Sequence, residues 1–219
     1  MPTDKEIDRF IRAIAEPHPA GMFNPWSQQS PSELKPLAYL ARRKRLHHHL
    51  DCPNPRIILI GEAAGYQGCR FSGIPFTSER LLLEGQIPRM PDLKGKRLTS
   101  RPRPWSEPSA TVVWETLHAL GLASETILFN AVPWHPEGAK GALSNRTPTL
   151  AEKREGVPYL SHFMSLFPGV PIAALGNTAS AMLAFLGLPH IQVRHPAYGG
   201  ATQFRTGLSD LVNAGKSVA

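Results

Sequence analysis

Apolar residues follow two patterns along this chain, and the first predicts buried strands. Short runs rich in β-branched residues, bounded by glycine, proline or asparagine, occur at residues 56–60, 126–130, 170–175 and 190–194. Runs of this length and composition are typical of strands that are covered on both faces. We therefore expect four buried strands.

The second pattern is a helical period between these runs, at residues 32–49, 109–120, 149–167, 177–186 and 201–213. The start at 149 is marked most clearly, because Thr149 can cap the helix and Glu152, three residues later, can complete a capping box. Alternating strands and helices predict an α/β fold, a three-layer α/β/α sandwich around a central four-stranded parallel sheet. In such a sheet, binding residues gather at the carboxyl ends of the strands.

The length of 219 residues suits one domain, so we expect residues 1–219 to form a single domain with an N-terminal helical extension over about 1–50. Residues 85–108 show neither period and contain five prolines, which predicts a basic, Pro-rich insertion loop. We give equal weight to a phosphate-contacting flap and to a solvated surface insertion. The cations of this loop are Arg89, Lys94, Lys96, Arg97, Arg101 and Arg103.

The charge balance favours a polyanionic partner. The chain has 24 Lys and Arg against 17 Asp and Glu, a net charge of +7. Residues 42–45 are all basic and three histidines follow at 47–49. Adjacent residues on a helix point in different directions, so we interpret this stretch as a basic, solvated face able to touch phosphate rather than as a metal site.

Cysteine content and hydropathy exclude several classes of protein. The two cysteines, Cys52 and Cys69, are too far apart for a CxxC pair, so the chain alone can build neither a disulfide framework nor a four-thiolate metal site. No apolar run approaches the length that spans a membrane, and the charged start MPTDKEIDRF is unlike a signal peptide. We therefore expect a cytoplasmic protein with no membrane contact.

Three short motifs stand where the predicted strands end. GEAAG at 61–65 runs on to GIPF at 73–76, NAVP occupies 130–133, and HPAY occupies 195–198. Each motif alone is more often structural than functional, since a glycine pair can make a tight turn and an asparagine can cap a backbone. Because the carboxyl ends of parallel strands meet at one edge of the sheet, the three together indicate a shared pocket.

With these motifs in this order, the chain resembles the uracil-DNA glycosylase superfamily from about residue 56 to 198. GEAAG, GIPF, the NRTPT segment at 145–149 and HPAY are most similar to the thermophile-type iron–sulfur enzymes, whereas ILFNAV at 127–132 is close to the classical branch. Phe76 lies 15 positions after Gly61, a spacing similar to that of the ring that stacks on uracil in that branch.

The departures from the superfamily pattern carry information. Trp134 and Gly156 stand where the iron–sulfur enzymes have cluster cysteines, and tryptophan cannot bind iron, so we expect no cluster, no metal and no other cofactor. Ala63 replaces the aspartate of the classical first motif, and Gly65 replaces the tyrosine that excludes thymine. Gly199 and Gly200 replace an apolar wedge, which leaves Tyr198 or a residue of the basic loop to fill the vacated base stack.

The resemblance implies a division of roles among the motif residues. Asn130 presents an amide oxygen and an NH₂ group that match the adjacent N–H and carbonyl of uracil but mismatch cytosine. His195 would stabilise the charge on the departing base, and Glu62 would orient water or stabilise the sugar cation. The expected base-binding residues are Gly61, Ala63, Gly65, Phe76 and Asn130, and the expected DNA-binding residues are Arg101, Arg103, Arg146 and Tyr198.

We therefore expect a monomeric, monofunctional DNA glycosylase that flips uracil out of DNA, cuts its N-glycosidic bond and releases free uracil, leaving an abasic site. The alternatives are a glycosylase for another damaged base, such as hypoxanthine or a modified pyrimidine, and a DNA-binding relative without activity. A nucleotide-binding α/β enzyme is disfavoured, because no GxGxxG or GKT/GKS sequence follows the first strand. Strand preference, the range of bases and the water-activating residue stay open.

Overall fold

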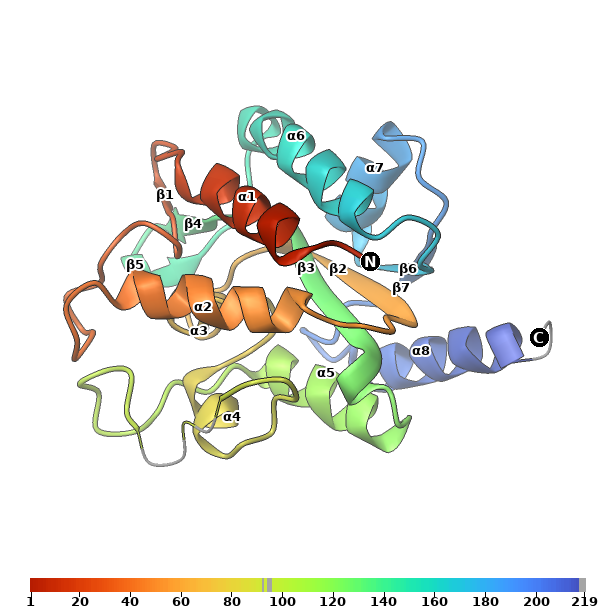
Figure 1. Cartoon of the computed structure of the whole chain (residues 1–219), viewed down its shortest axis with the longest axis horizontal. Helices are drawn as coiled ribbons and strands as arrows, with labels where there is room; N and C mark the ends of the chain where they lie inside the picture. Colours follow the sequence, from red (N-terminus) through yellow and green to blue (C-terminus); the bar gives the residue numbers. More distant parts are fainter. Residues whose placement is uncertain (92, 94–95, 217–219) are drawn as a thin grey trace.

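A parallel four-stranded sheet lies at the centre of the computed structural model, which describes residues 1–91, 93 and 96–216. The strands run in the order β3-β2-β6-β7, so β2 has a neighbour on each side (Figure 1). All four predicted strands are confirmed, and the first two continue past the predicted end. Their bounds are β2 Ile57–Ala63, β3 Thr126–Val132, β6 Ile172–Leu175 and β7 Ile191–Val193.

Helices cover both faces of this sheet, which confirms the three-layer α/β/α sandwich. Ile58 and Ile60 of β2 face one layer, while Ile57 and Leu59 face the other, as expected when side chains alternate along a strand. The first layer holds α1 Asp4–Ala15, α2 Ala38–Leu50, α6 Leu150–Leu166 and α7 Asn177–Phe185. The second holds α4 Glu79–Leu83, α5 Pro108–Ala119 and α8 Ala201–Lys216.

The helix boundaries follow the capping signals. The predicted capping box of α6 is present, because the Thr149 hydroxyl accepts from the Glu152 backbone N–H and the Glu152 carboxylate accepts from the Thr149 N–H. The helix predicted to start at 32 begins only at Ala38, since Leu37 before it has a left-handed backbone (φ 54°). Three short helical elements not predicted from the sequence are α3 Cys69–Ser72, α4 Glu79–Leu83 and the 3₁₀ turn Ala123–Glu125.

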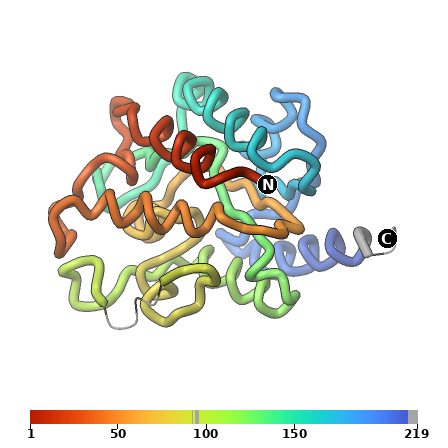
Figure 2. Tube along the Cα trace, in the orientation of Figure 1, coloured from red at the N-terminus to blue at the C-terminus, as the bar shows by residue number. Residues whose placement is uncertain are grey.

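The first helix packs into the main core rather than standing apart from it. Thr3 and Glu6 form a capping box at its start, and Ile7, Phe10 and Ile14 are buried. Figures 1 and 2 both show α1 beside α6. A further tie comes from Trp134, whose indole N–H donates to the Ile14 carbonyl at 2.9 Å. Trp134, which stands where the iron–sulfur enzymes have a cluster cysteine, therefore anchors α1.

A second, antiparallel sheet was not predicted by the strand and helix alternation. Its order is β1-β4-β5, with bounds β1 Met22–Phe23, β4 His135–Gly138 and β5 Gly141–Asn145. The β4–β5 hairpin follows directly from the carboxyl end of β3, and β1 pairs with β4, the central strand of this sheet. This hairpin carries Asn145 to the end of the central sheet.

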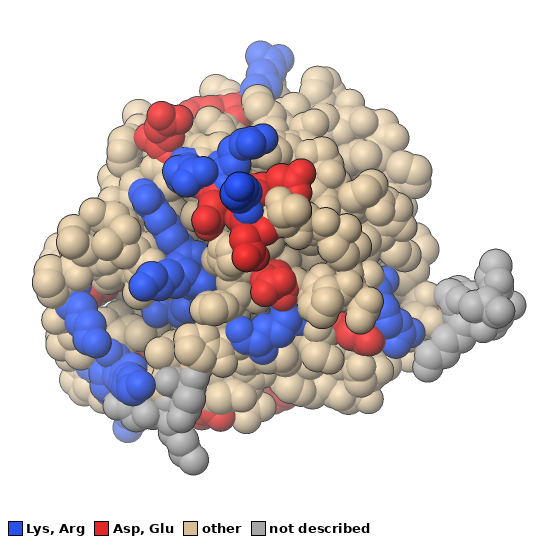
Figure 3. Space-filling model, in the orientation of Figure 1, with Lys and Arg blue, Asp and Glu red and all other residues tan. Residues whose placement is uncertain are grey.

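The interpretation of residues 42–45 as a solvated basic face is wrong for two of the four cations. Arg42 and Arg45 are buried, and burial lowers their pKa values to about 9 and about 10. Arg45 donates to the carbonyls of Ser72 and Phe71, and Arg42 pairs with Glu33. On the visible face over α1 and α2, cations and carboxylates are interspersed rather than gathered by sign (Figure 3).

The Pro-rich loop is organised around a buried carboxylate. Glu79, at the start of α4, is 0% exposed and accepts from the backbone N–H groups of Leu98, Thr99 and Trp105 and from the Thr99 hydroxyl, at 2.8–3.0 Å. The Trp105 ring stacks on Phe71 with centroids 5.3 Å apart. This segment is thus tied to the domain and is not a purely solvated insertion.

The loop cations divide into structural and exposed groups. Arg89, proposed as a phosphate contact, instead donates to the carbonyls of His49 and Thr126 at 3.0 Å each, so its guanidinium is used inside the protein. Arg97 lies 3.5 Å from Glu79. Arg101 and Arg103 are exposed, and Lys94 lies outside the described residues.

Candidate active site

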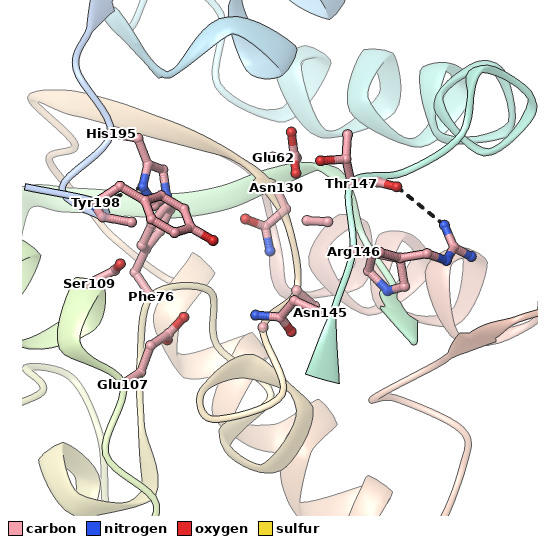
Figure 4. Close-up of a pocket in the computed structure, with 15 residues that line it drawn as sticks. Glu62, Phe76, Glu107, Ser109, Asn130, Asn145, Arg146, Thr147, His195 and Tyr198 are labelled. Carbon is pink, nitrogen blue, oxygen red and sulfur yellow. Dashed lines mark hydrogen bonds between the residues drawn. The ribbon is translucent and has the colours of Figure 1, made fainter. Parts of the chain in front are cut away.

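A cavity of about 280 Å³ lies at the carboxyl ends of the central strands. All three sequence motifs contribute to its lining, as expected for a parallel sheet. Figure 4 shows side chains from several different elements converging on this space. The predicted residues that line it are Glu62, Ala63, Gly65, Phe76, Asn130, Arg146, His195 and Tyr198. Gly61, Arg101 and Arg103 do not line it.

Gly61 lies directly beneath the cavity and lets two side chains approach it. A Cβ atom at this position would lie 2.5 Å from the Phe76 ring and 2.7 Å from the Asn130 Oδ1. Both distances are shorter than van der Waals contact, so any side chain here would displace the ring or the amide. Gly61 on β2 is paired in register with Asn130 on β3, which fixes this arrangement in the sheet.

The Asn130 amide is buried at the end of β3 and is only 2% exposed. No residue within the described part of the chain makes a hydrogen bond with this side chain. A buried amide without a partner costs free energy, which a ligand that pairs with it would recover. The arrangement therefore favours a ligand with both a donor and an acceptor on one edge.

Phe76 forms a wall of the cavity in a strained conformation. It is 7% exposed and has a φ of 50°, a left-handed backbone that is rare for a bulky residue and costs on the order of 1–3 kcal/mol. Its ring centroid lies 5.7 Å from that of His195, with a 42° angle between the planes. Together the two rings make a surface on which a planar ligand can lie.

His195 follows β7 and is held as a neutral donor. Its Nδ1 accepts from the Ala197 backbone N–H at 3.1 Å, so the proton of the neutral ring is assigned to Nε2. Burial, together with the nearby charge of Arg194, lowers the pKa of His195 to about 4. The imidazole is therefore uncharged near neutral pH and offers one N–H.

Glu62 lies beside Asn130 at the end of β2 and is half-buried. Its Oε2 accepts from the hydroxyl of Thr178 on α7, which holds the carboxylate in place. Glu62, His195 and Tyr198 also line an adjoining cleft of about 420 Å³, which continues past Arg194. The carboxylate thus stands at the junction of the cavity and an open channel.

The rim of the cavity presents one large exposed side chain. Tyr198 is 99% exposed and has a φ of 53°. Large aromatic side chains are rarely so exposed, and large residues rarely adopt a left-handed backbone. Gly200 closes the turn after it, where a Cβ would lie 2.1 Å from the His195 carbonyl oxygen. The turn that positions His195 therefore also projects Tyr198 outward.

The predicted cations lie at different depths around the site. The Arg146 guanidinium forms two hydrogen bonds with the Glu152 carboxylate, at 2.6 and 2.7 Å, so it lines the cavity as half of an ion pair. Arg101 stacks over the Trp105 ring at 4.1 Å from its centroid, and Arg103 is exposed nearby in sequence. These two retain exposed charge.

With this geometry in hand, comparison with known proteins places the chain in a family. The model of the uracil DNA glycosylase superfamily matches residues 48–213. The chain belongs to this superfamily. A search of curated proteins found no match. Among solved structures, wild-type SMUG2 of Pedobacter heparinus matches with a TM-score of 0.67 and 17% identity, over 100% of this chain and 98% of that one, which supports the fold.

Membership identifies the protein as a DNA glycosylase, an enzyme that cuts N-glycosidic bonds in DNA. In this glycosylase, Trp134 and Gly156 pack against neighbouring elements at the two positions compared with cluster cysteines. Cys52 and Cys69 are free and buried. Among the described residues, no group of three or more potential ligand side chains could hold a metal ion, and no helix has the length and apolarity to cross a membrane.

Sequence reasoning did not assign roles to several residues that line the glycosylase cavity. Asn145 and Thr147 belong to the NRTPT segment, and the Asn145 Oδ1 accepts from the Tyr66 backbone N–H at 2.9 Å. The NRTPT segment resembles the superfamily pattern, so the sequence does indicate these two residues as site candidates. Glu107 and Ser109, at the start of α5, carry no such signal, because they lie at the end of the Pro-rich loop and just after it, outside the motifs.

Proposed function

We propose that this glycosylase excises uracil from DNA by flipping the base into the cavity and hydrolysing its bond to the sugar. The observation that supports this most directly is the pairing of two groups in one cavity. The unpaired amide of Asn130 can read the edge of a base, and the neutral imidazole of His195 can donate to it. Phe76 offers a ring on which the base can stack, which offsets part of the cost of unstacking it from DNA.

Base selection rests on Asn130 in this proposal. Its Oδ1 can accept from a ring N–H while its NH₂ donates to the adjacent carbonyl, which is the pattern of uracil. Cytosine has the reverse pattern, so both contacts would be lost. Since the amide is buried, each mismatch would leave one of its polar atoms without a partner on the base.

Bond cleavage needs opposite kinds of help at its two ends. Negative charge collects on the departing base, and the Nε2–H of His195 would stabilise it by a hydrogen bond from a neutral imidazole. Positive charge collects on the sugar, and the Glu62 carboxylate would stabilise it or orient the attacking water. Thr178 holds that carboxylate at the mouth of the open cleft, through which water can enter.

Tyr198 is proposed to occupy the gap that the flipped base leaves in the duplex. Its ring is exposed at the rim and carries both an apolar face and a hydroxyl. Arg101 and Arg103 are proposed to contact phosphates beside the site, because their charges are exposed while Arg89 and Arg97 are engaged within the protein.

Alkaline cleavage of labelled oligonucleotides tests the function. Wild-type protein and Asn130→Asp would be compared under single-turnover conditions on DNA with uracil, cytosine, hypoxanthine, or thymine opposite guanine. We expect cleavage at uracil by the wild type, and a much lower preference for uracil over cytosine in the variant. DNA binding without cleavage of any substrate would instead support an inactive relative.

Another damaged base is the second candidate substrate. Gly65 places no side chain of its own in the cavity, so this position does not screen out a substituted base as the tyrosine of the classical branch does. Faster cleavage at hypoxanthine than at uracil in the same experiment would favour this function.

A further inference from the structure

A carboxyl group on the cavity wall has no role in the mechanism described above. Glu107 is the N-cap residue of α5, a position whose side chain commonly accepts from the first helical N–H groups, yet the Glu107 carboxyl makes no such bond. It lines the cavity instead, on the side away from Glu62 and Thr147 (Figure 4). Its Oε2 is shielded from solvent and makes no hydrogen bond with any described residue.

Two glycines make room for this carboxyl. A Cβ at Gly65 would lie 2.7 Å from the Glu107 Oε1, and one at Gly68 would lie 2.0 Å from Oε2. The backbone of the first motif therefore packs directly on the carboxyl group. Any side chain at either glycine would displace it from the cavity, so the absence of side chains there and the presence of Glu107 depend on each other.

The surroundings of Glu107 favour its neutral form. Burial raises its pKa to about 7, and none of the neighbouring groups supplies a compensating cation. Two nearby titratable groups are the buried Cys69 thiol, whose pKa is also raised, and His195, which is uncharged above about pH 4. The cavity is also lined by Glu62, Tyr198 and Arg146, and the Arg146 charge is paired with Glu152. A protonated carboxyl has one O–H donor, whereas an ionised one can only accept.

We propose that Glu107 is a specificity-determining residue that donates a hydrogen bond to a carbonyl oxygen of the flipped base. Asn130 would approach this oxygen from the ring N–H side and Glu107 from the other side. In thymine, that other side carries the methyl group, which would press against the carboxyl and block the bond. The inference rests on the proposed function, since it concerns how the same cavity tells uracil from thymine.

The test compares Glu107→Leu and Glu107→Gln with wild type, using uracil and thymine opposite guanine in single-turnover excision. Leucine has no donor for the uracil carbonyl, and its apolar branches can pack against the thymine methyl group, so we expect the uracil-to-thymine rate ratio to fall at least ten-fold. Glutamine keeps a donor, so its ratio should stay within about three-fold of wild type. Glu115→Gln, on the exposed side of the same helix, serves as the matched control.

The ratio separates specificity from stability, because a merely structural defect lowers both rates together. An unchanged ratio in a folded Glu107→Leu protein that still excises uracil overturns the inference and leaves the proposed function intact. Absence of uracil excision by wild type overturns both.

A second measurement does not depend on the leucine variant folding. Between pH 6.5 and 8.5, uracil excision by wild type should fall relative to Glu107→Gln, because only the carboxyl can lose its proton. Superimposable pH profiles would overturn the inference.

Discussion

The cavity and the Pro-rich loop both contain buried polar groups, but the source of their hydrogen-bond partners differs. The loop donates four hydrogen bonds to the Glu79 carboxylate of α4, and the Arg89 guanidinium of the loop donates to backbone carbonyls. In the cavity, Asn130 and Glu107 make no side-chain hydrogen bonds with the described residues. Buried polar groups are normally paired, and Asn130 and Glu107 differ from the other unpaired groups in that they line a cavity, where a ligand can supply the partner.

This difference predicts two classes of mutational effect. Changes in the cavity should alter catalysis and leave stability almost unchanged or improved, since the unpaired groups contribute little to folding. Changes in the loop's network should lower stability while the folded protein keeps its chemistry. Measurements of catalysis and of stability on variants of each region therefore test whether its hydrogen bonding predicts its role.

The largest expected effect is on catalysis, from His195→Ala. Loss of the Nε2–H donor should lower the single-turnover rate of uracil excision by a factor on the order of hundreds, because the charge on the departing base loses its stabilisation. The melting temperature should fall only modestly, because the variant loses one protein hydrogen bond, from the Ala197 backbone N–H to the His195 Nδ1. His48→Ala, exposed on α2, is the control. A variant that keeps the full rate would remove His195 from this role.

The next effect is on stability, from Glu79→Gln. An amide can accept fewer of the four hydrogen bonds and adds donors without acceptors, so we expect a loss of about 2–3 kcal/mol in the free energy of unfolding. Urea titration measures this loss. Glu84→Gln removes an exposed pair with Arg80 and should cost well under 1 kcal/mol. Equal losses in the two variants would contradict the structural role of Glu79.

Glu107 should make stability fall as pH rises. Its pKa is about 7 in the folded protein against an ordinary value of 4.5, so its favourable contribution is complete below pH 4.5 and is lost as pH rises through 7. Glu107→Gln does not ionise, so it should gain about 2 kcal/mol over wild type between pH 5 and pH 8. Thermal unfolding at both pH values measures this gain, and a constant difference would show that Glu107 is not buried as a neutral acid.

The sheet and much of the pocket could be predicted because their signals are local. Apolar runs bounded by glycine identify the strands, and motifs at their carboxyl ends meet by the geometry of a parallel sheet. Gly61, Phe76, Asn130 and His195 lie at or immediately beside the cavity for this reason. The capping box at Thr149 likewise lies within four residues of sequence.

The rest depends on contacts between distant segments. Glu107 enters the cavity only because Gly65 and Gly68 leave room for it. No sequence pattern around residue 107 predicts this contact. Arg42 and Arg89 look like solvated cations in sequence, yet both donate to backbone carbonyls of other segments. Charge in a sequence indicates a polar residue, and only the fold decides whether its partner is solvent, DNA or the protein itself.

The smallest expected effect concerns the loop's exposed cations. If Arg101 and Arg103 meet phosphates, replacing both with glutamine should reduce the slope of log affinity against log salt by about one to two units, since each lost contact releases fewer counterions. Arg9→Gln with Arg12→Gln removes the same charge from exposed positions on α1 and is the control. Equal slopes for the two double variants would mean that the loop acts only through net charge. A change confined to Arg101 and Arg103 would show that a structurally anchored loop also presents a DNA-binding edge.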